Sequence, residues 1–302
     1  MTQNLTGKVA IVTGGGGSLG GAYALALARR GAKVVVNDLG SAPAGGGASR
    51  GPADQIVAEI QSLGGSAVAN YDSVTEGARV MQCALDTYGR IDVVVNNAGI
   101  LRDMSFHKMS TADFEDLYQV HLLGTFSLCN AAWPHLRGQG FGRIVNTGSA
   151  AGIYGNFGQA NYSAMKLGIH GLTLSLAAEG RAKNIHVNTI APAALSRLTL
   201  TVMSAEQLQA MRPDLVAPLV LWLCDPACTE SGGLFEVGGG WIGKLRWERA
   251  AGHHFSPGAP LTPEDVAAQW QAITRFGPDS THPASMAEAF GPFEKVMKGE
   301  IT

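Results

Sequence analysis

Short apolar runs alternate with amphipathic segments from residue 8 to about residue 240. Each run is continuous and rich in valine and isoleucine, which is typical of strands that are buried on both faces of a sheet. We predict strands over residues 9–12, 34–36, 67–69, 91–95, 144–145, 185–190 and 234–237.

The segments between these runs have helical spacing of apolar residues. They predict helices over residues 21–30, 54–63, 75–88, 111–137, 161–181 and 213–224. Strands that are separated by helices pair in parallel and are covered on both faces. Because such crossovers are right-handed, we expect an α/β fold, a Rossmann-like doubly wound parallel sheet of about seven strands.

The chain divides into two parts that differ in pattern. Residues 1–243 carry the whole alternation and are predicted to form the Rossmann-like domain. Residues 244–302 form a C-terminal extension with helices predicted over 263–276 and 283–299. The extension lacks strand periodicity and is too short for a large core of its own. We therefore expect it to pack on the domain or on a partner subunit.

Composition limits the class of protein. Hydrophobic residues make up 46% of the chain, charged residues 15%, and the net charge is −2. These values predict a large buried core and argue against a nucleic-acid partner. The four cysteines are not arranged with histidines at ligand spacing, so we expect reduced thiols and no metal site.

The termini and the apolar runs also predict a location. The sequence starts without a basic segment followed by an apolar one, and no apolar run reaches the roughly 18 residues that span a bilayer. The last four residues, Gly-Glu-Ile-Thr, are not a Ser-Lys-Leu address. We expect a cytoplasmic protein without a membrane span.

A glycine-rich loop over residues 13–20 follows the first predicted strand and precedes a helix. Glycines let the backbone approach a pyrophosphate closely, and the helix N-terminus supplies free N–H groups and a positive dipole end. A plain tight turn is the alternative interpretation. The predicted dinucleotide-binding residues are Gly14, Gly17, Ser18, Leu19 and Gly20.

Asp38 ends the second predicted strand, about 20 residues beyond the glycine loop. A carboxylate at this place can accept both ribose hydroxyls of adenosine, and it repels the 2′-phosphate of NADP. The next arginine that could hold that phosphate, Arg50, lies near the far end of a glycine-rich loop over residues 40–52. We therefore predict NAD as the cofactor, with a helix-cap or turn aspartate as the alternative.

Ser149, Tyr162 and Lys166 form the candidate chemical group. Tyr162 and Lys166 are four residues apart on a predicted helix and project from the same face. A nearby ammonium favours the phenolate and lowers the pKa of a tyrosine toward the range of a useful base. Ser149 follows a predicted strand at the carboxyl edge of the sheet, where its hydroxyl can bind a substrate oxygen.

In this order and combination the residues resemble the short-chain dehydrogenase/reductase superfamily over residues 8–240. The resemblance implies that Tyr162 is the general acid/base, that Lys166 binds the nicotinamide ribose and tunes Tyr162, and that Ser149 holds the reacting oxygen. It also implies further cofactor-binding residues: Asp72 and Ser73 near the adenine, Asn97, Ala98 and Gly99 near a ribose, and Pro192 after the sixth strand.

Several stretches, among them residues 35–40, 91–103, 152–162 and 232–249, are similar to the dehydrogenase part of peroxisomal multifunctional enzyme type 2. That family implies a (3R)-hydroxyacyl-CoA dehydrogenase, also described as a 17β-hydroxysteroid dehydrogenase. We expect interconversion of (3R)-3-hydroxyacyl-CoA and 3-oxoacyl-CoA with NAD. Oxidation of a hydroxysteroid is the alternative, and a non-catalytic dinucleotide sensor is a remote one. By resemblance, a homodimer or homotetramer is expected.

Three positions depart from the common superfamily pattern. Ser18 stands where the loop usually has its middle glycine, so the local backbone could be strained. His121 replaces the helix asparagine of a proton relay, and could hold the relay water and titrate near neutrality, or simply be bonded in the core. Ala193 follows Pro192 where glycine is common.

Overall fold

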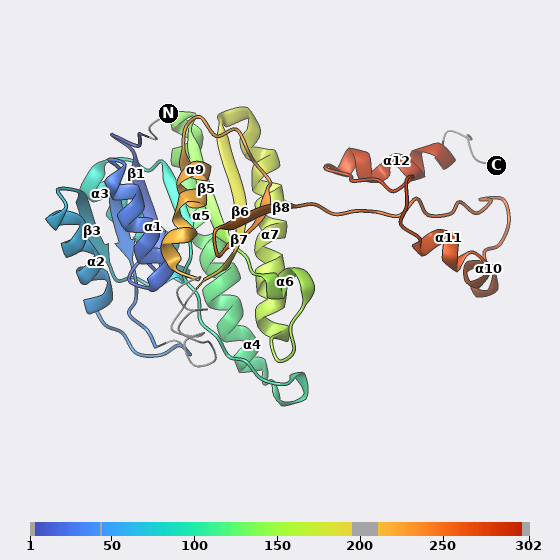
Figure 1. Ribbon diagram of the computed structural model, residues 1–302, viewed down its shortest axis with the longest axis horizontal. Coiled ribbons are helices and arrows are strands. Elements are labelled where there is room, and N and C mark those ends of the chain that lie inside the picture. The colour runs from blue at the N-terminus through green and yellow to red at the C-terminus, as the bar shows by residue number, and fades with distance from the viewer. Residues whose placement is uncertain (1–3, 43, 195–210, 298–302) are drawn as a thin grey trace. The chain divides into compact units, whose positions relative to one another are not determined.

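The computed structural model describes residues 4–42, 44–194 and 211–297. Its centre is an eight-stranded sheet with the strand order β3-β2-β1-β4-β5-β6-β7-β8 (Figure 1). The bounds of the strands are β1 Val9–Thr13, β2 Lys33–Asn37, β3 Ser66–Asn70, β4 Val93–Asn96, β5 Gly142–Thr147, β6 Ile185–Ala193, β7 Leu234–Gly238 and β8 Trp241–Leu245. The pairs from β3 to β7 are all parallel, which confirms the predicted doubly wound fold.

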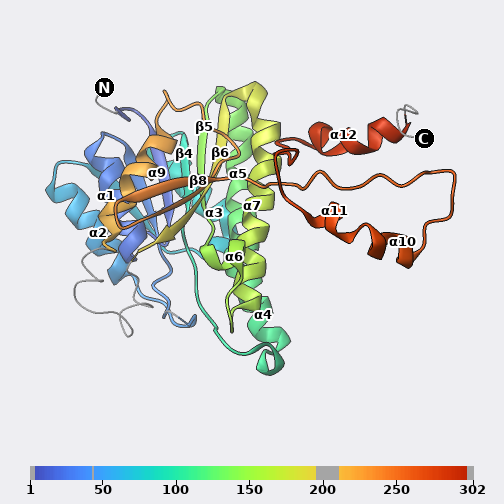
Figure 2. The same ribbon diagram turned by 45° about the vertical axis from the view of Figure 1, so that its right-hand side comes forward.

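Helices cover both faces of this sheet (Figures 1 and 2). Those in the described part of the sheet domain are α1 Ser18–Arg29, α2 Gly51–Ser62, α3 Gly77–Tyr88, α4 Thr111–Leu117, α5 Gly124–Gln139, α6 Ala150–Tyr154, α7 Ala160–Gly180 and α9 Ala217–Cys224. No helix in the described residues is both long and apolar enough to cross a bilayer.

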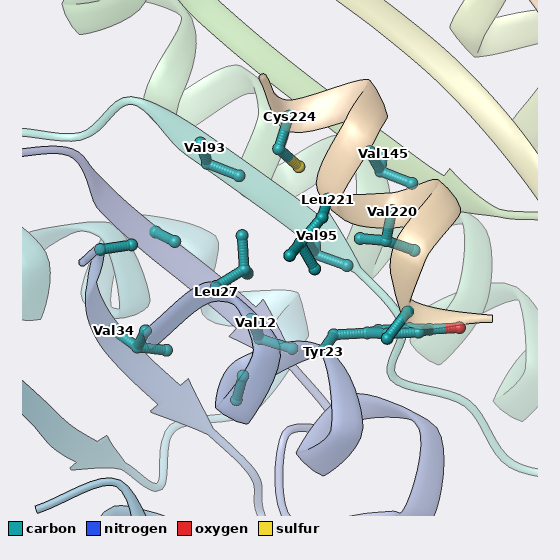
Figure 3. Packing of buried hydrophobic residues seen from close by; sticks show 14 of the residues in the cluster. Val12, Tyr23, Leu27, Val34, Val93, Val95, Val145, Val220, Leu221 and Cys224 are labelled. Carbon is teal, nitrogen blue, oxygen red and sulfur yellow. The ribbon is translucent and has the colours of Figure 1, made fainter. Parts of the chain in front are cut away.

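Strand side chains alternate between the two faces, and each face has its own core. Val12 and Val34 pack with Leu27 of α1 and with α9 on one face (Figure 3). Ile11 packs with Leu128 of α5 on the other face. Both sides of each central strand are therefore out of water, which explains why the strands read as continuous apolar runs rather than as alternating ones.

The eighth strand was not predicted. Gly239 and Gly240 have φ angles of 57° and 82° and join β7 to β8 in two residues. A connection this short allows only antiparallel pairing, and both turn positions require the left-handed backbone that glycine adopts easily. The Gly-Gly pair between two apolar runs was the sequence signal for this hairpin.

The helix predicted over residues 111–137 is interrupted. A capping box of Ser110 and Asp113 begins α4, but Tyr118–Leu123 forms a π-helical turn before α5 begins at Gly124. An extra residue in such a turn rotates the side chains that follow it, and π-turns are frequent at functional sites. This turn contains His121.

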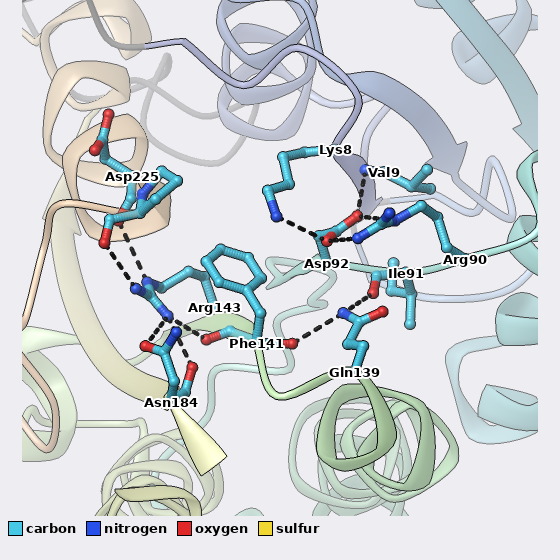
Figure 4. A network of polar contacts seen from close by, with 12 residues as sticks. Lys8, Val9, Arg90, Ile91, Asp92, Gln139, Phe141, Arg143, Asn184 and Asp225 are labelled. Atoms are coloured by element: carbon cyan, nitrogen blue, oxygen red, sulfur yellow. Dashed lines mark hydrogen bonds and ion pairs between the residues drawn. The ribbon is translucent and has the colours of Figure 1, made fainter.

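Two buried ionic clusters hold the loops at the ends of the strands (Figure 4). The fully buried Asp92 carboxylate accepts hydrogen bonds from the Val9 backbone and from Arg90, and pairs with Lys8 at 3.2 Å. The buried Arg143 guanidinium donates to backbone carbonyls, among them those of residues 184, 225 and 226. A buried charge costs little only when it is paired or hydrogen-bonded in this way.

The described chain forms two compact units, Met1–Lys244 and Leu245–Thr302. The second unit contains α10 Pro263–Ala268, α11 Trp270–Thr274 and α12 Met286–Met297. The single helix predicted over 263–276 is thus two helices, and residues 298 and 299 of the other predicted helix lie outside the described residues. Whether this extension packs on the domain or on a partner stays a prediction.

Candidate active site

The predicted site residues meet at the carboxyl edge of the central strands. Most of them follow the ends of β1 to β5, whereas Tyr162 and Lys166 lie on α7, His121 lies in the π-turn before α5, and Pro192 lies in the last part of β6. In the sheet, β1 lies beside β4. From β1 the chain proceeds outward through β2 to β3, whereas β4 begins the other half of the sheet. Such a reversal point is where doubly wound sheets bind ligands, because the connecting loops diverge and leave a crevice.

The glycine loop begins with Gly14 in the left-handed region, at a φ of 62°. A Cβ on Gly20 would lie 2.1 Å from the Gly14 carbonyl oxygen, so only glycine fits where α1 crosses the loop. Gly17 caps α1 without a side-chain hydrogen bond, which leaves N–H groups of the first turn available to an anion. Ser18 has no positive φ, so the predicted departure brings no backbone strain.

Asn97 and Ala98 fasten β4 to this loop. Their backbone N–H groups donate to the Thr13 hydroxyl at 3.0 and 3.1 Å, and the Asn97 amide donates to the carbonyl oxygens of Thr13 and Gly14 at 3.1 and 3.3 Å. The Asn97 side chain therefore sets the shape of the loop. Gly99 is required beside it, because a Cβ there would lie 2.6 Å from the His121 ring.

Asp38 lies against the glycine loop, as predicted. One carboxylate oxygen accepts the Gly16 N–H at 2.8 Å and the other accepts the Gly40 N–H at 2.7 Å. Each oxygen keeps lone pairs for a further donor. Arg50 lies with its guanidinium 4.9 Å from the centre of the Tyr71 ring.

The residues predicted near the adenine are held by neighbours on β3, in the 3₁₀ turn that follows it and on α3. Asp72 accepts a hydrogen bond from the Asn70 amide at 2.8 Å and pairs with Arg79 at 3.1 Å. The Ser73 hydroxyl caps the 3₁₀ turn Val74–Glu76 by accepting from the Thr75 N–H. These contacts fix the carboxyl end of β3, next to β2 and Asp38.

Ser149 and Tyr162 come together as predicted, from two different helices. Ser149 is the N-cap of α6, and its hydroxyl accepts the Ala151 N–H at 3.2 Å. The same side chain hydrogen-bonds the Tyr162 phenol. Burial nevertheless raises the pKa of Tyr162, the Ser149 contact lowers it in part, and the negative charge of Asp103 raises it further. The phenol is thus protonated at neutral pH in this state.

Lys166 is buried one helical turn beyond Tyr162. Its Nζ donates to the Thr147 carbonyl oxygen at 2.8 Å and lies 5.5 Å from the centre of the Tyr162 ring. Burial lowers the pKa of Lys166 to about 7. The expected lowering of the Tyr162 pKa by a full ammonium charge is therefore outweighed here, since burial penalises the charged forms of both groups.

His121 packs edge-on against Tyr162, with ring centres 5.3 Å apart. The expectation that it titrates near neutrality is wrong: burial, and next the charge of Lys166, lower its pKa to about 3. The Nε2 atom of the neutral ring lies 2.8 Å from the Ile100 carbonyl oxygen and 3.2 Å from the Ile100 N–H, and the tautomer decides whether it donates to the first or accepts from the second. Its buried Nδ1 has no hydrogen-bond partner among the described residues.

Pro192 lies near the end of β6, in a part of the strand where a residue without an N–H group is tolerated. The ladder between β5 and β6 ends at Ile190, whereas β6 continues beside β7 through Ala193. Pro192 has no N–H, and it lies where only one neighbouring strand remains. Ala193 continues the strand, so no special glycine turn is needed there.

The sequence motifs did not predict two residues of this site. Thr13 binds Asn97 and Ala98, and the fully buried Asn161 precedes Tyr162. No local pattern marks either residue, because each acts on a segment that is distant in the sequence. A polar residue at the end of an otherwise apolar strand was the one available signal for Thr13.

Comparison with known proteins agrees with this geometry. Residues 8–210 match the family model described as short chain dehydrogenase. The chain is 56% identical over 292 residues to peroxisomal multifunctional enzyme type 2 of Mus musculus, and 53% identical over 289 residues to peroxisomal multifunctional enzyme A of Dictyostelium discoideum. Each match covers 96% of this chain, but only 40% and 65% of those relatives' lengths.

Solved structures give the same result. Full-length peroxisomal multifunctional enzyme type 2 from Drosophila melanogaster is 38% identical with a TM-score of 0.84, covering 98% of this chain and 50% of its own. A 7α-hydroxysteroid dehydrogenase complexed with NADH and 7-oxo glycochenodeoxycholic acid is 32% identical with a TM-score of 0.71, covering 79% of this chain and 96% of its own.

These relatives contradict the predicted cytoplasmic location, since they are named as peroxisomal enzymes. The prediction rested on the lack of a recognisable terminal signal. This is weak evidence, because a targeting signal is a short segment that a receptor reads, and the fold does not reveal it. The family model matches more than half of the chain, and the predicted superfamily resemblance is confirmed. The chain belongs to the short chain dehydrogenase family.

Proposed function

We propose that this protein interconverts a (3R)-3-hydroxyacyl thioester and the 3-oxoacyl thioester with NAD. The observation that carries the proposal is the convergence of Ser149, Tyr162 and Lys166 beside the glycine loop, at one edge of the sheet. A non-catalytic dinucleotide sensor would not need a hydroxyl, a phenol and a buried lysine in contact. The name of a relative that is 39% identical over 248 residues, hydroxyacyl-CoA dehydrogenase ChsB1 of Mycobacterium tuberculosis, supports the hydroxyacyl substrate.

The residues present fit a nicotinamide dinucleotide. The uncapped N-terminus of α1 and the glycines around it leave room and N–H donors for a pyrophosphate. Asp38 would hold the adenosine ribose, and Lys166 would exchange its Thr147 contact for the ribose next to the nicotinamide. The proposed remaining cofactor contacts are Gly14, Ser18, Leu19, Asp72, Ser73, Asn97, Ala98, Gly99 and Pro192.

The chain's own residues would move the proton. Ser149 would hold the substrate oxygen, and the Tyr162 phenolate would accept the hydroxyl proton as the alcohol becomes a ketone. In the reverse direction the protonated phenol would donate that proton to the carbonyl oxygen. The bound nicotinamide would supply the hydride acceptor or donor. His121, as a neutral ring, would orient a water through its free Nδ1 rather than carry charge.

A rate survey tests the proposed function. Initial rates with NAD would be measured for a panel of (3R)-3-hydroxyacyl-CoA thioesters, their (3S) isomers and hydroxysteroids. We expect the highest kcat/KM for a (3R) thioester. Equal rates for both isomers, or no turnover of any thioester, would contradict the proposal.

A hydroxysteroid is the second candidate substrate. The observation that favours it is the similarity to a solved hydroxysteroid dehydrogenase, 32% identical over 79% of this chain. In the same panel, a steroid with the highest kcat/KM would establish this alternative. A peroxisomal location is proposed with either substrate, on the names of the relatives.

The preference for NAD is expected to depend on Asp38. In the wild-type protein kcat/KM should be at least about tenfold higher with NAD than with NADP, because two negative charges a few ångströms apart repel each other. Asp38→Ala should lower the ratio of kcat/KM with NAD to kcat/KM with NADP. It should also weaken the binding of NAD, because the Gly16 and Gly40 N–H groups lose their acceptor. Asp86→Ala, on the outer surface of α3, is the control. An unchanged ratio would contradict the role of Asp38.

A homo-oligomer that forms through α4, α5 and α7 is proposed. Five apolar side chains of this surface are 38–46% exposed: Phe114, Tyr118, Phe126, Leu167 and Leu174. Two of them, Tyr118 and Phe126, line a hollow of about 310 Å³ together with Leu122, Leu123 and Leu172. An exposed apolar patch of this kind is typical of an interface. Light scattering at micromolar concentration should give a dimer or tetramer, and Leu174→Glu should shift the mass toward the monomer.

A further inference from the structure

The segment that follows the cofactor motif is fastened to the first turn of the helix that carries Tyr162. The Met104 N–H donates to the Gly158 carbonyl oxygen at 2.8 Å. The Gln159 amide donates to the Asp103 carboxylate, also at 2.8 Å. A third contact comes from Asn161, whose amide donates to the carbonyl oxygen of residue 102 at 3.2 Å.

Asn161 is fully buried and uses both atoms of its amide. Its Nδ2 donates to the residue 102 carbonyl and, at 3.4 Å, to the Asp113 carbonyl of α4. Its Oδ1 accepts the Tyr162 N–H at 2.8 Å. That N–H lies in the first turn of α7, where the helix offers no acceptor and Gln159 provides no side-chain cap. Asn161 therefore satisfies a donor of Tyr162 and links it to two other segments.

The other end of this connection is also fixed. The Arg102 guanidinium pairs with Asp116 at 2.8 Å and with Asp113 at 3.6 Å, both on α4. Only Gly99, Ile100 and Leu101 separate Arg102 from Ala98, which is bonded to Thr13 at the glycine loop. A short run of chain thus leads from the loop of the predicted cofactor site to the backbone of Tyr162.

We propose that Asn161 is a positioning residue that sets the place of the Tyr162 phenol, by anchoring the first turn of α7 to residues 102–104. The anchor is a packed, hydrogen-bonded connection rather than a contact with substrate. This inference rests on the proposed role of Tyr162 in proton transfer. A misplacement of a reacting group by about 1 Å can cost on the order of 10²-fold in rate.

The test compares Asn161→Ala with Asn188→Ala. Asn188 is an equally buried asparagine that bonds β6 to the chain at Glu230 and Gly233, away from Tyr162. Both variants should lose similar thermal stability, since each leaves buried backbone groups unpaired. We expect kcat of Asn161→Ala to fall roughly 10- to 100-fold, with the Kd for NADH, measured by fluorescence, within about twofold of wild type. The control should keep wild-type kcat.

Hydrogen exchange of the cofactor-free protein gives a readout that does not depend on turnover. In Asn161→Ala, the amides of residues 102–104 and of Tyr162 should exchange faster, and in Asn188→Ala they should not. If the wild-type protein turns over no substrate, the proposed function fails, but the exchange result still tests the anchor. If Tyr162→Phe is inactive while Asn161→Ala keeps wild-type kcat, the anchor is refuted and the proposed function stands.

Two further variants define what the anchor requires. Asn161→Asp retains the acceptor for the Tyr162 N–H but places no donor toward residue 102, so we expect a loss of kcat close to that of Asn161→Ala. Wild-type kcat in Asn161→Asp would overturn the anchor, because capping of Tyr162 alone would then suffice. Gln159→Ala removes the Asp103 contact, together with the hydrogen bond that Gln159 accepts from the Asn156 amide, and leaves Asn161 in place. It serves if the Asn161 variants do not fold. Gln159→Ala should lower kcat several-fold and leave the Kd for NADH unchanged. A wild-type kcat in this variant would also overturn the proposal.

Discussion

Tyr162→Phe is expected to lower kcat by at least about 10²-fold, the loss that removal of a general acid–base typically causes. The phenol is hydrogen-bonded to Ser149 and its ring centre lies 5.5 Å from the Lys166 Nζ, so the substitution removes the group that is proposed to exchange the proton. The phenyl ring keeps its edge-on packing against His121, at 5.3 Å between ring centres. The melting temperature should therefore stay at the wild-type value or rise, because a partly desolvated hydroxyl is removed.

Steady-state kinetics with the best substrate of the panel measure this loss, and calorimetry measures the stability. Tyr88→Phe is a matched control, since it removes a hydroxyl that hydrogen-bonds Ser66 near the surface and keeps the ring. It should retain wild-type kcat. Turnover of Tyr162→Phe within a few-fold of wild type would mean that another group moves the proton, and the proposed mechanism would then be wrong.

Lys166→Met is expected to reduce kcat/KM by a factor of about 10² as well, while it makes the cofactor-free protein more stable. The methionine keeps the apolar stem but loses the charge that supports the phenolate and the donor that would bind a ribose hydroxyl. Stability should increase because the folded pKa of Lys166, about 7, lies below the unfolded value of 10.5. Folding therefore disfavours the ammonium form, and burial of this charge lowers the stability of the wild-type protein.

The pH dependence of this gain has a definite sign. The folded pKa of Lys166 lies below its unfolded pKa, so burial of the ammonium destabilises the folded protein. This destabilisation is complete below about pH 7, where the lysine is protonated in both the folded and the unfolded state. The penalty disappears as the pH rises toward 10.5, where the neutral amine prevails in both states. Since one pKa unit corresponds to roughly 1.4 kcal/mol, the gain at pH 6 is on the order of a few kcal/mol, or several degrees in melting temperature.

Melting curves of wild type and Lys166→Met at pH 6 and pH 10 test this prediction. The difference between the two proteins should be largest at pH 6 and small at pH 10. Lys183→Met, at an exposed lysine, should leave melting temperature and activity unchanged at both values. A variant that is less stable than wild type at pH 6 would show that the ammonium of Lys166 is stabilised in the folded protein.

The sequence by itself determined the layers of the fold and the order of its motifs. Strands such as residues 9–12 and 34–36 were recognisable because burial on both faces demands an unbroken apolar run. Gly14, Gly20, Tyr162 and Lys166 were recognisable because their chemistry is local. A left-handed turn needs glycine, and a one-turn spacing on a helix puts two side chains on one face.

Tertiary structure alone decided the electrostatic state of the site. The pKa of His121 falls to about 3 and that of Lys166 to about 7 only because segments distant in the sequence close over them. The π-turn at Tyr118–Leu123 and the contacts of Asn161 were equally invisible, since each depends on which surface packs against which. Periodicity reports which face of an element is buried, whereas the charge state and exact partners of a polar side chain depend on neighbours that only the folded chain brings together.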